Sequence, residues 1–279
     1  MKKKGIQESD RLTAQQKENG GAERIFGESA QVHEQAVHSV SEIVLRRLQQ
    51  KYPKLSFRYR NSIPKKEINE YLQKIDSSLG QTLFVSNANI RPDGGIIEVQ
   101  DDHGRWRIVV VSEAKFQGKD IDNIKAGVFV GKKNNQVLMV AGNAIERAHK
   151  NIREIANFML MEQHFPYILF LEGSNFLTQD VNIERPDGSI YTLTYDNGAL
   201  NRLDRLTASN YGMPINANLC ENKYIANKSN SIMLQAVSIY TKGNGERWED
   251  EDMIKIVLDI ANTSIRVLSR DLFDQLTKD

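Results

Sequence analysis

Residues 89–115, NIRPDGGIIEVQDDHGRWRIVVVSEAK, contain the stretch that decides the fold. Within it, residues 96–99 (IIEV) predict a short strand and residues 101–104 (DDHG) predict a turn. Residues 105–115 predict a second strand, whose central run IVVV is apolar on both faces. A strand of this kind lies in the interior of a sheet that has a layer on each side. The stretch therefore predicts a hairpin at the centre of a layered protein.

The segments that follow predict a crossover connection. Residues 143–162 place apolar side chains three and four apart, from Ile145 to Met159, and Asn143 is a suitable N-cap for such a helix. Residues 165–171 are then continuously apolar, which predicts another buried strand. Strand, helix and strand in this order indicate a partly parallel sheet.

The remaining segments add elements around this sheet. Helical spacing also occurs in residues 28–51, in residues 254–268 and, more weakly, in residues 65–75 and 198–209. A hairpin is expected around residues 186–189 (PDGS), and residues 231–240 (SIMLQAVSIY) predict a further strand or buried segment. We predict an α/β fold in which helices sandwich a mixed central β-sheet.

The domain organisation follows from composition. Residues 1–21 carry few large apolar groups, so they cannot offset the entropy cost of ordering, and we expect a mobile N-terminal arm. A disordered tail without a function is the alternative for this segment. No break in composition divides the rest, so residues 22–279 are expected to form a single α/β domain.

Charge and cysteine content limit the function classes. The 37 basic residues are balanced by 36 acidic ones, so a nucleic-acid partner would need a local basic patch. Cys220 is the single cysteine, which excludes an intramolecular disulfide and metal sites built on paired cysteines. No apolar run is long enough to cross a bilayer and no signal core follows Met1, so we expect a cytoplasmic protein.

Asp93, Glu113 and Lys115 form the candidate catalytic set. Residues two apart on a strand point the same way, so Glu113 and Lys115 share a face, and the hairpin brings them back towards Asp93. Mg²⁺ binds carboxylates, waters and substrate phosphate, and it lowers the pKa of a bound water. We predict Asp93 and Glu113 as Mg²⁺ ligands, with the carbonyl of Ala114 as a further ligand. Lys115 would orient the attacking water and offset charge on phosphorus.

Each half of this pattern occurs a second time in the chain. RPDG at residues 91–94 is repeated at residues 185–188, and Glu221 and Lys223 repeat the acid-x-Lys spacing. The second pair has no preceding apolar strand, and its halves lie well over thirty residues apart, outside hairpin geometry. We interpret the second RPDG as a bare turn. For the first pair, the alternative is a surface turn beside an ordinary Glu–Lys pair.

These residues also resemble a known family. Residues 90–95 (IRPDGG) with residues 113–115 (EAK) are similar to the PD-(D/E)xK nuclease superfamily. From about Phe26 to the C-terminus, further stretches resemble the EcoRI family of type II restriction endonucleases: LSFRYR (55–60), GNAIER (142–147), ANFML (156–160), LFLEGSNFLT (169–178), NRLDRLTA (201–208) and NYGMPIN (210–216).

The resemblance implies a restriction-endonuclease-like fold and a function in a restriction–modification system. It implies Mg²⁺-dependent hydrolysis of double-stranded DNA at a palindromic hexanucleotide, GAATTC, leaving 5′-phosphate ends. It further implies a homodimer in which residues 22–279 carry catalysis, DNA recognition and dimerisation, with no organic cofactor and no membrane partner.

The resemblance also implies that residues 139–147 read bases in the major groove. Arginine pairs bidentately with guanine, asparagine with adenine, and small apolar side chains contact thymine methyl groups. The DNA contacts expected on this basis are Met139, Val140, Ala141, Gly142, Asn143, Ala144, Glu146, Arg147, Arg202, Arg205, Arg91 and Lys119.

Some of these assignments have plain alternatives. Arg202 and Arg205 could lie on a solvated helix face with Asp204 as their partner, and Asn143 could be only a helix cap. Three positions depart from the family pattern: Val140 stands for alanine, Phe116 for histidine and Arg91 for lysine. Phe116 removes a titratable neighbour of the catalytic set, whereas Arg91 keeps its positive charge.

Two rival functions remain on the same fold. A DNA repair nuclease does not need the base-reading segment at residues 142–147, and a non-catalytic DNA-binding protein does not need Asp93, Glu113 and Lys115 together. Both features favour a site-specific endonuclease.

Overall fold

The computed structural model describes residues 28–81, 87–127, 143–195 and 197–277. The predicted N-terminal arm, residues 1–21, lies outside this part of the chain. The described elements are α2 (Glu28–Lys51), β1 (Phe57–Arg60), β2 (Ile63–Pro64), α3 (Lys65–Ile75), β3 (Asn89–Ile90), β4 (Gly95–Gln100), β5 (Trp106–Phe116), α4 (Asp120–Lys125), α5 (Asn143–Phe158), β6 (Tyr167–Glu172), η1 (Ser174–Phe176), β7 (Val181–Glu184), β8 (Ile190–Leu193), α6 (Asn197–Ser209), β9 (Lys223–Asn227), β10 (Asn230–Leu234), β11 (Ser238–Thr241), α7 (Asp250–Val267) and α8 (Phe273–Thr277).

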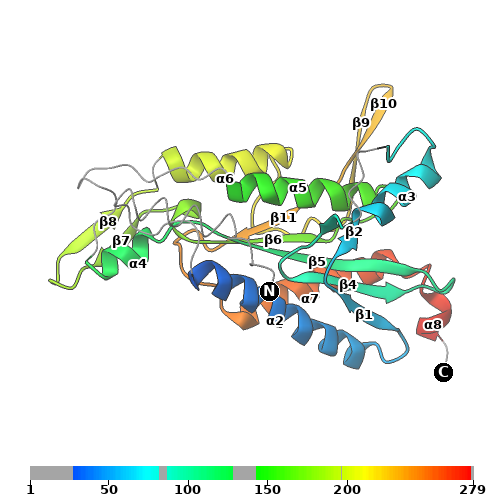
Figure 1. Cartoon of the computed structure of the whole chain (residues 1–279), viewed down its shortest axis with the longest axis horizontal. Helices are drawn as coiled ribbons and strands as arrows, with labels where there is room; N and C mark the ends of the chain where they lie inside the picture. The colour runs from blue at the N-terminus through cyan, green and yellow to red at the C-terminus, as the bar shows by residue number, and fades with distance from the viewer. Residues whose placement is uncertain (1–27, 82–86, 128–142, 196, 278–279) are drawn as a thin grey trace, which may run out of the picture.

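A five-stranded mixed sheet forms the centre of the protein, in the order β1-β4-β5-β6-β11 (Figure 1). β1, β4 and β5 pair antiparallel, whereas β5, β6 and β11 pair parallel. The doubly apolar strand β5 is the middle strand, as its sequence predicts. The helix α5 lies between β5 and β6 in the chain, which confirms the predicted crossover.

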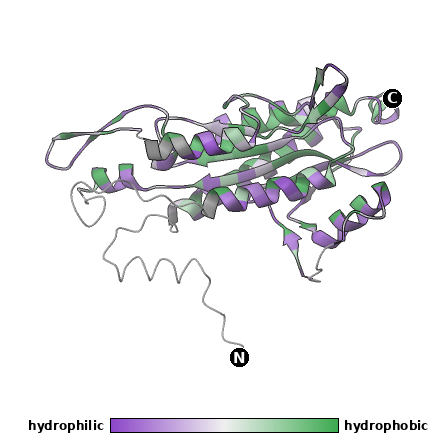
Figure 2. Ribbon diagram, turned by 90° about the horizontal axis from the view of Figure 1, so that it is seen from above, coloured by the Kyte–Doolittle hydropathy of each residue, from purple (hydrophilic) through white to green (hydrophobic). Residues whose placement is uncertain are grey.

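Helices cover both faces of the sheet (Figure 1). α2 and α7 pack on one face with Val109 of β5, and α5 and α6 pack on the other face with Val111. Figure 2 shows the apolar residues gathered on the strands between these two layers. The predicted fold class, a mixed sheet sandwiched by helices, is confirmed.

Two sequence-based boundaries were wrong. The helix that begins at Asn143 ends at Phe158 and not at Glu162. Arg107 of β5 holds the Glu162 carboxylate, with Nε donating to Oε1 at 2.9 Å, so a long-range contact fixes the chain beyond the helix. Residues 231–240 are split between two strands: β10 forms a hairpin with β9, and β11 joins the central sheet.

The second RPDG copy forms the turn between β7 and β8, as predicted. Asp187 there is exposed, and it accepts hydrogen bonds from the backbone N–H and the hydroxyl of Ser189. Among the described helices, none combines the length and the apolar character that a membrane span requires.

Candidate active site

The β4–β5 hairpin places Asp93 beside the C-terminal end of β5. The amide of Gly94 donates to the carbonyl of Ser112 at 2.9 Å, and the amide of Gly95 closes a turn onto the carbonyl of Pro92 at 3.1 Å. Asp93 is held in this turn, directly before β4. Its Oδ2 lies 3.4 Å from the backbone nitrogen of Ala114, one residue beyond Glu113.

Three oxygen atoms converge on the ammonium of Lys115. Its Nζ lies 2.6 Å from Asp93 Oδ2 and 2.8 Å from the Ala114 carbonyl oxygen. The same ammonium forms an ion pair with Glu113 Oε1. The structure thus brings together the catalytic set that the sequence predicts, with the Ala114 carbonyl as its fourth member.

The three side chains of this set are largely buried. Glu113 is fully buried, and the side chains of Lys115 and Asp93 are 13% and 22% exposed. Burial raises the pKa of Glu113, and the Lys115 ammonium opposes this shift. Burial alone would lower the pKa of Lys115, but Glu113 and Asp93 outweigh it and raise that pKa. Lys115 therefore keeps its charge at neutral pH.

The donor set matches the needs of a magnesium ion. No group of three or more His, Cys, Asp or Glu suited to a metal occurs among the described residues. Mg²⁺ does not require one, because it keeps several waters and binds through one or two carboxylates and a substrate phosphate. The oxygens of Asp93, Glu113 and Ala114 already gather around one positive charge. Hard oxygen donors arranged in this way fit Mg²⁺.

Two residues that the sequence analysis missed also hold Glu113. Asn151 of α5 donates from Nδ2 to both carboxylate oxygens, at 3.1 Å each, and the hydroxyl of Tyr167 donates to Oε2 at 2.9 Å. Tyr167 is the first residue of β6, the parallel neighbour of β5. No local signal marks either residue, because each comes from an element that meets Glu113 only in the folded chain.

A third missed residue, Glu34 of α2, belongs to the surroundings of the site. Its pKa is raised, first by burial and then by the negative charge of Asp93. α2 passes directly over the turn that carries Asp93: a Cβ added at Gly94 would lie 2.6 Å from Val37 Cγ1. Val37 is three residues after Glu34, so both lie on the same side of this helix.

Gly94 gives a test of this close packing. We expect Gly94→Ala to lower the free energy of unfolding by about 1–3 kcal/mol and to displace Asp93, because its Cβ would meet Val37 and Ser112 below 3.0 Å. Urea unfolding and cleavage assays would measure both effects. Gly188 is the counterpart in the second RPDG copy, and its added Cβ would meet nothing within 4 Å, although its φ of +79° strains any side chain there. Gly188→Ala should therefore lower the free energy of unfolding by about 1–2 kcal/mol through the backbone alone and leave cleavage unchanged. An equal loss of cleavage in both variants would contradict the assignment.

The predicted DNA-contacting residues are distributed as follows. Residues 139–142 lie outside the described part of the chain, and Asn143 and Ala144 begin α5. Glu146, Arg147, Arg205 and Arg91 are exposed, and Lys119 is half-buried where α4 begins. Arg202 is only 1% exposed, so the solvated-face alternative is wrong for this arginine.

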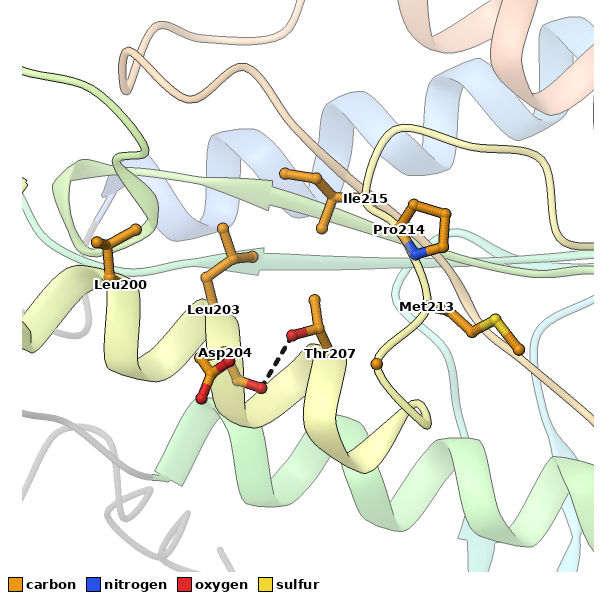
Figure 3. A pocket seen from close by; sticks show the side chains of 8 residues that line it. Leu200, Leu203, Asp204, Thr207, Met213, Pro214 and Ile215 are labelled. Carbon is orange, nitrogen blue, oxygen red and sulfur yellow. Dashed lines mark hydrogen bonds between the residues drawn. The ribbon is translucent and has the colours of Figure 1, made fainter.

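A groove beside α6 contains no cluster of charged groups comparable to the catalytic set (Figure 3). It has a volume of about 710 Å³ and lies between α6 and the loop that contains Met213 and Pro214. Among the described residues that line it, Asp204 is the only titratable one. Among the described residues, the catalytic set therefore remains the candidate active site.

Comparison with known proteins assigns the family. A family model described as restriction endonuclease EcoRI matches residues 19–275. The type II restriction enzyme EcoRI of Escherichia coli is 63% identical over 270 residues, which cover 97% of this chain and 98% of that enzyme. The type II restriction enzyme RsrI of Cereibacter sphaeroides is 47% identical over 269 residues, which cover 96% of each chain. This likeness over nearly the whole length shows that the chain belongs to the EcoRI family of type II restriction endonucleases.

Proposed function

We propose that this restriction endonuclease uses Mg²⁺ to cleave double-stranded DNA at the palindrome GAATTC, leaving 5′-phosphate ends. The convergence of the Asp93, Glu113 and Ala114 oxygens on one positive charge carries the proposal. Membership in the EcoRI family supports the DNA substrate and the role in a restriction–modification system.

Each member of the catalytic set has a distinct role in this proposal. Asp93 and Glu113 would hold the metal with the carbonyl of Ala114, and the bound ion would polarise the phosphodiester and lower the pKa of a water. The raised pKa of Lys115 keeps its ammonium protonated. It would orient the attacking water and stabilise the negative charge that builds up on the phosphoryl oxygens.

DNA recognition is assigned to the start of α5 and the segment before it. Arg147 is exposed in the second turn of α5, where a bidentate contact to guanine O6 and N7 is expected. Asn143 and Ala144 would also face base edges, and Met139 and Ala141 would contact pyrimidines. Arg205, Arg91 and Lys119 would bind phosphates or support the neighbouring contacts, and Glu146 would orient arginines.

A homodimer follows from the symmetry of the proposed substrate. The described part of one chain carries a single catalytic set, whereas a palindrome presents two identical half-sites and two bonds to be cut. Two copies related by a twofold axis would meet both half-sites with the same residues. Sedimentation of the full chain with and without a GAATTC duplex would measure this state.

Digestion of a plasmid of known sequence tests the proposed function. With Mg²⁺ we expect fragments whose ends all map to GAATTC and carry 5′-phosphates, and with EDTA we expect intact plasmid. Specific binding without cleavage in Mg²⁺ would instead indicate a non-catalytic DNA-binding protein. Cleavage in EDTA would exclude the assigned metal chemistry.

A further inference from the structure

Asn151 has no role in the chemistry proposed above, yet it holds the most deeply buried group of the site. Its Nδ2 lies 3.1 Å from Glu113 Oε1 and 3.1 Å from Glu113 Oε2, so one amide group donates to both oxygens. The terminal torsion of a glutamate is soft and broad. Contact at both oxygens therefore restricts the rotation of the carboxylate as well as its position.

The Glu113 carboxylate depends on such donors because it has no contact with solvent. It is 0% exposed, and a buried charge is costly unless it is paired and hydrogen-bonded. Lys115 and Tyr167 supply the other polar contacts, from β5 itself and from β6. Asn151 is the only one of these partners that lies on a helix outside the central sheet.

The helix that carries Asn151 also carries the proposed base-reading residues. Arg147 precedes Asn151 by four residues, so both lie on the same side of α5, about 6 Å apart along its axis. Arg147 is exposed and Asn151 is half-buried. A single rigid element thus runs from the surface expected to meet DNA to the carboxylate expected to bind the metal.

We propose that Asn151 is a positioning residue that couples base recognition by α5 to the placement of Glu113 for metal binding. This inference rests on the proposed function. When Arg147 and its neighbours meet the correct base pairs, α5 is held where the Asn151 amide fixes both carboxylate oxygens. A wrong base pair shifts α5, and the carboxylate loses its fixed rotation.

The test compares Asn151→Ala with the wild-type enzyme on two duplexes, one containing GAATTC and one with a single changed base pair. Substitution of residues that orient metal ligands commonly costs about 10- to 100-fold in activity or metal affinity. We expect single-turnover cleavage of GAATTC to fall by about this factor. The affinity of the GAATTC complex for Ca²⁺, measured by calorimetry, should fall in parallel, while metal-free DNA binding should change less than about twofold.

The ratio of the two cleavage rates distinguishes coupling between base recognition and Glu113 placement from a purely structural role of Asn151. Cleavage of the altered duplex should fall less than cleavage of GAATTC, so discrimination between the duplexes shrinks. An equal fall on both duplexes, or a GAATTC cleavage rate within about twofold of the wild type, would overturn the inference. Asn151→Leu has a similar volume and removes the donor without adding a charge, so it should show the same shrinkage if Asn151→Ala does not fold.

Asn262 provides a matched control on the opposite face of the sheet. It is a half-buried asparagine on α7 that donates to the carbonyl of Leu258 at 2.6 Å and accepts from Tyr52 at 2.8 Å. Asn262→Ala should lower stability without changing the ratio of the two cleavage rates. A wild-type enzyme that cuts no GAATTC duplex would refute the proposed function, whereas an active wild type with an unchanged Asn151→Ala ratio would refute this inference alone.

Discussion

Asp93→Ala is expected to abolish detectable cleavage of GAATTC while specific DNA binding remains measurable. Asp93 Oδ2 is one of the oxygens gathered around Lys115 Nζ, so its loss removes a proposed metal ligand. Asp93 is not part of the hydrophobic core, and Lys115 keeps its ion pair with Glu113, so the fold should persist. Cleavage would be followed on plasmid DNA in Mg²⁺, and binding by gel shift in EDTA.

The second RPDG copy supplies the control for this variant. Asp187 occupies the equivalent motif position, but it is exposed and accepts its hydrogen bonds from Ser189 within its own turn. Asp187→Ala should cleave like the wild type. An Asp93→Ala enzyme that still cuts would refute the metal-ligand assignment, and so would equal losses in the two variants.

Arg147→Ala is expected to cost about 1–3 kcal/mol of discrimination at one base pair of the site. The expectation follows from the exposed position of Arg147 near the start of α5 and from the bidentate geometry of an arginine with guanine. Binding would be measured in EDTA on GAATTC and on duplexes that change each base pair in turn. The variant should bind GAATTC more weakly than the wild type does, and it should bind the duplex changed at the base pair that Arg147 contacts as well as the wild type does. The variant's affinities for these two duplexes should therefore become similar.

A phosphate contact would give a different pattern. Equal weakening on every duplex would show that Arg147 binds the DNA backbone, because phosphates carry no sequence information. Arg153 is also exposed on α5, further from its N-terminus, and Arg153→Ala should leave discrimination unchanged.

Much of the fold could be predicted because its signals are local. The run IVVV predicts a strand that is covered on both faces, and β5 is indeed the central strand between two helical layers. The end of α5 at Phe158 could not be predicted, because the next residues are held by a long-range contact, that of Arg107 with Glu162. The candidate site also has a part that could be predicted from the sequence. Asp93, Glu113 and Lys115 are linked by one hairpin, and their proximity follows from the alternation of side chains along a strand.

The sequence by itself determined which strand is central and that two carboxylates and an amine meet at its end, since periodicity and hairpin geometry depend on near neighbours in the chain. Only the tertiary structure decided that Asn151 and Tyr167 fix the Glu113 carboxylate, and that Arg202 is buried and not on a solvated face. These contacts join separate elements whose side chains meet through packing. The spacing of residues along the chain does not predict how one element packs against another.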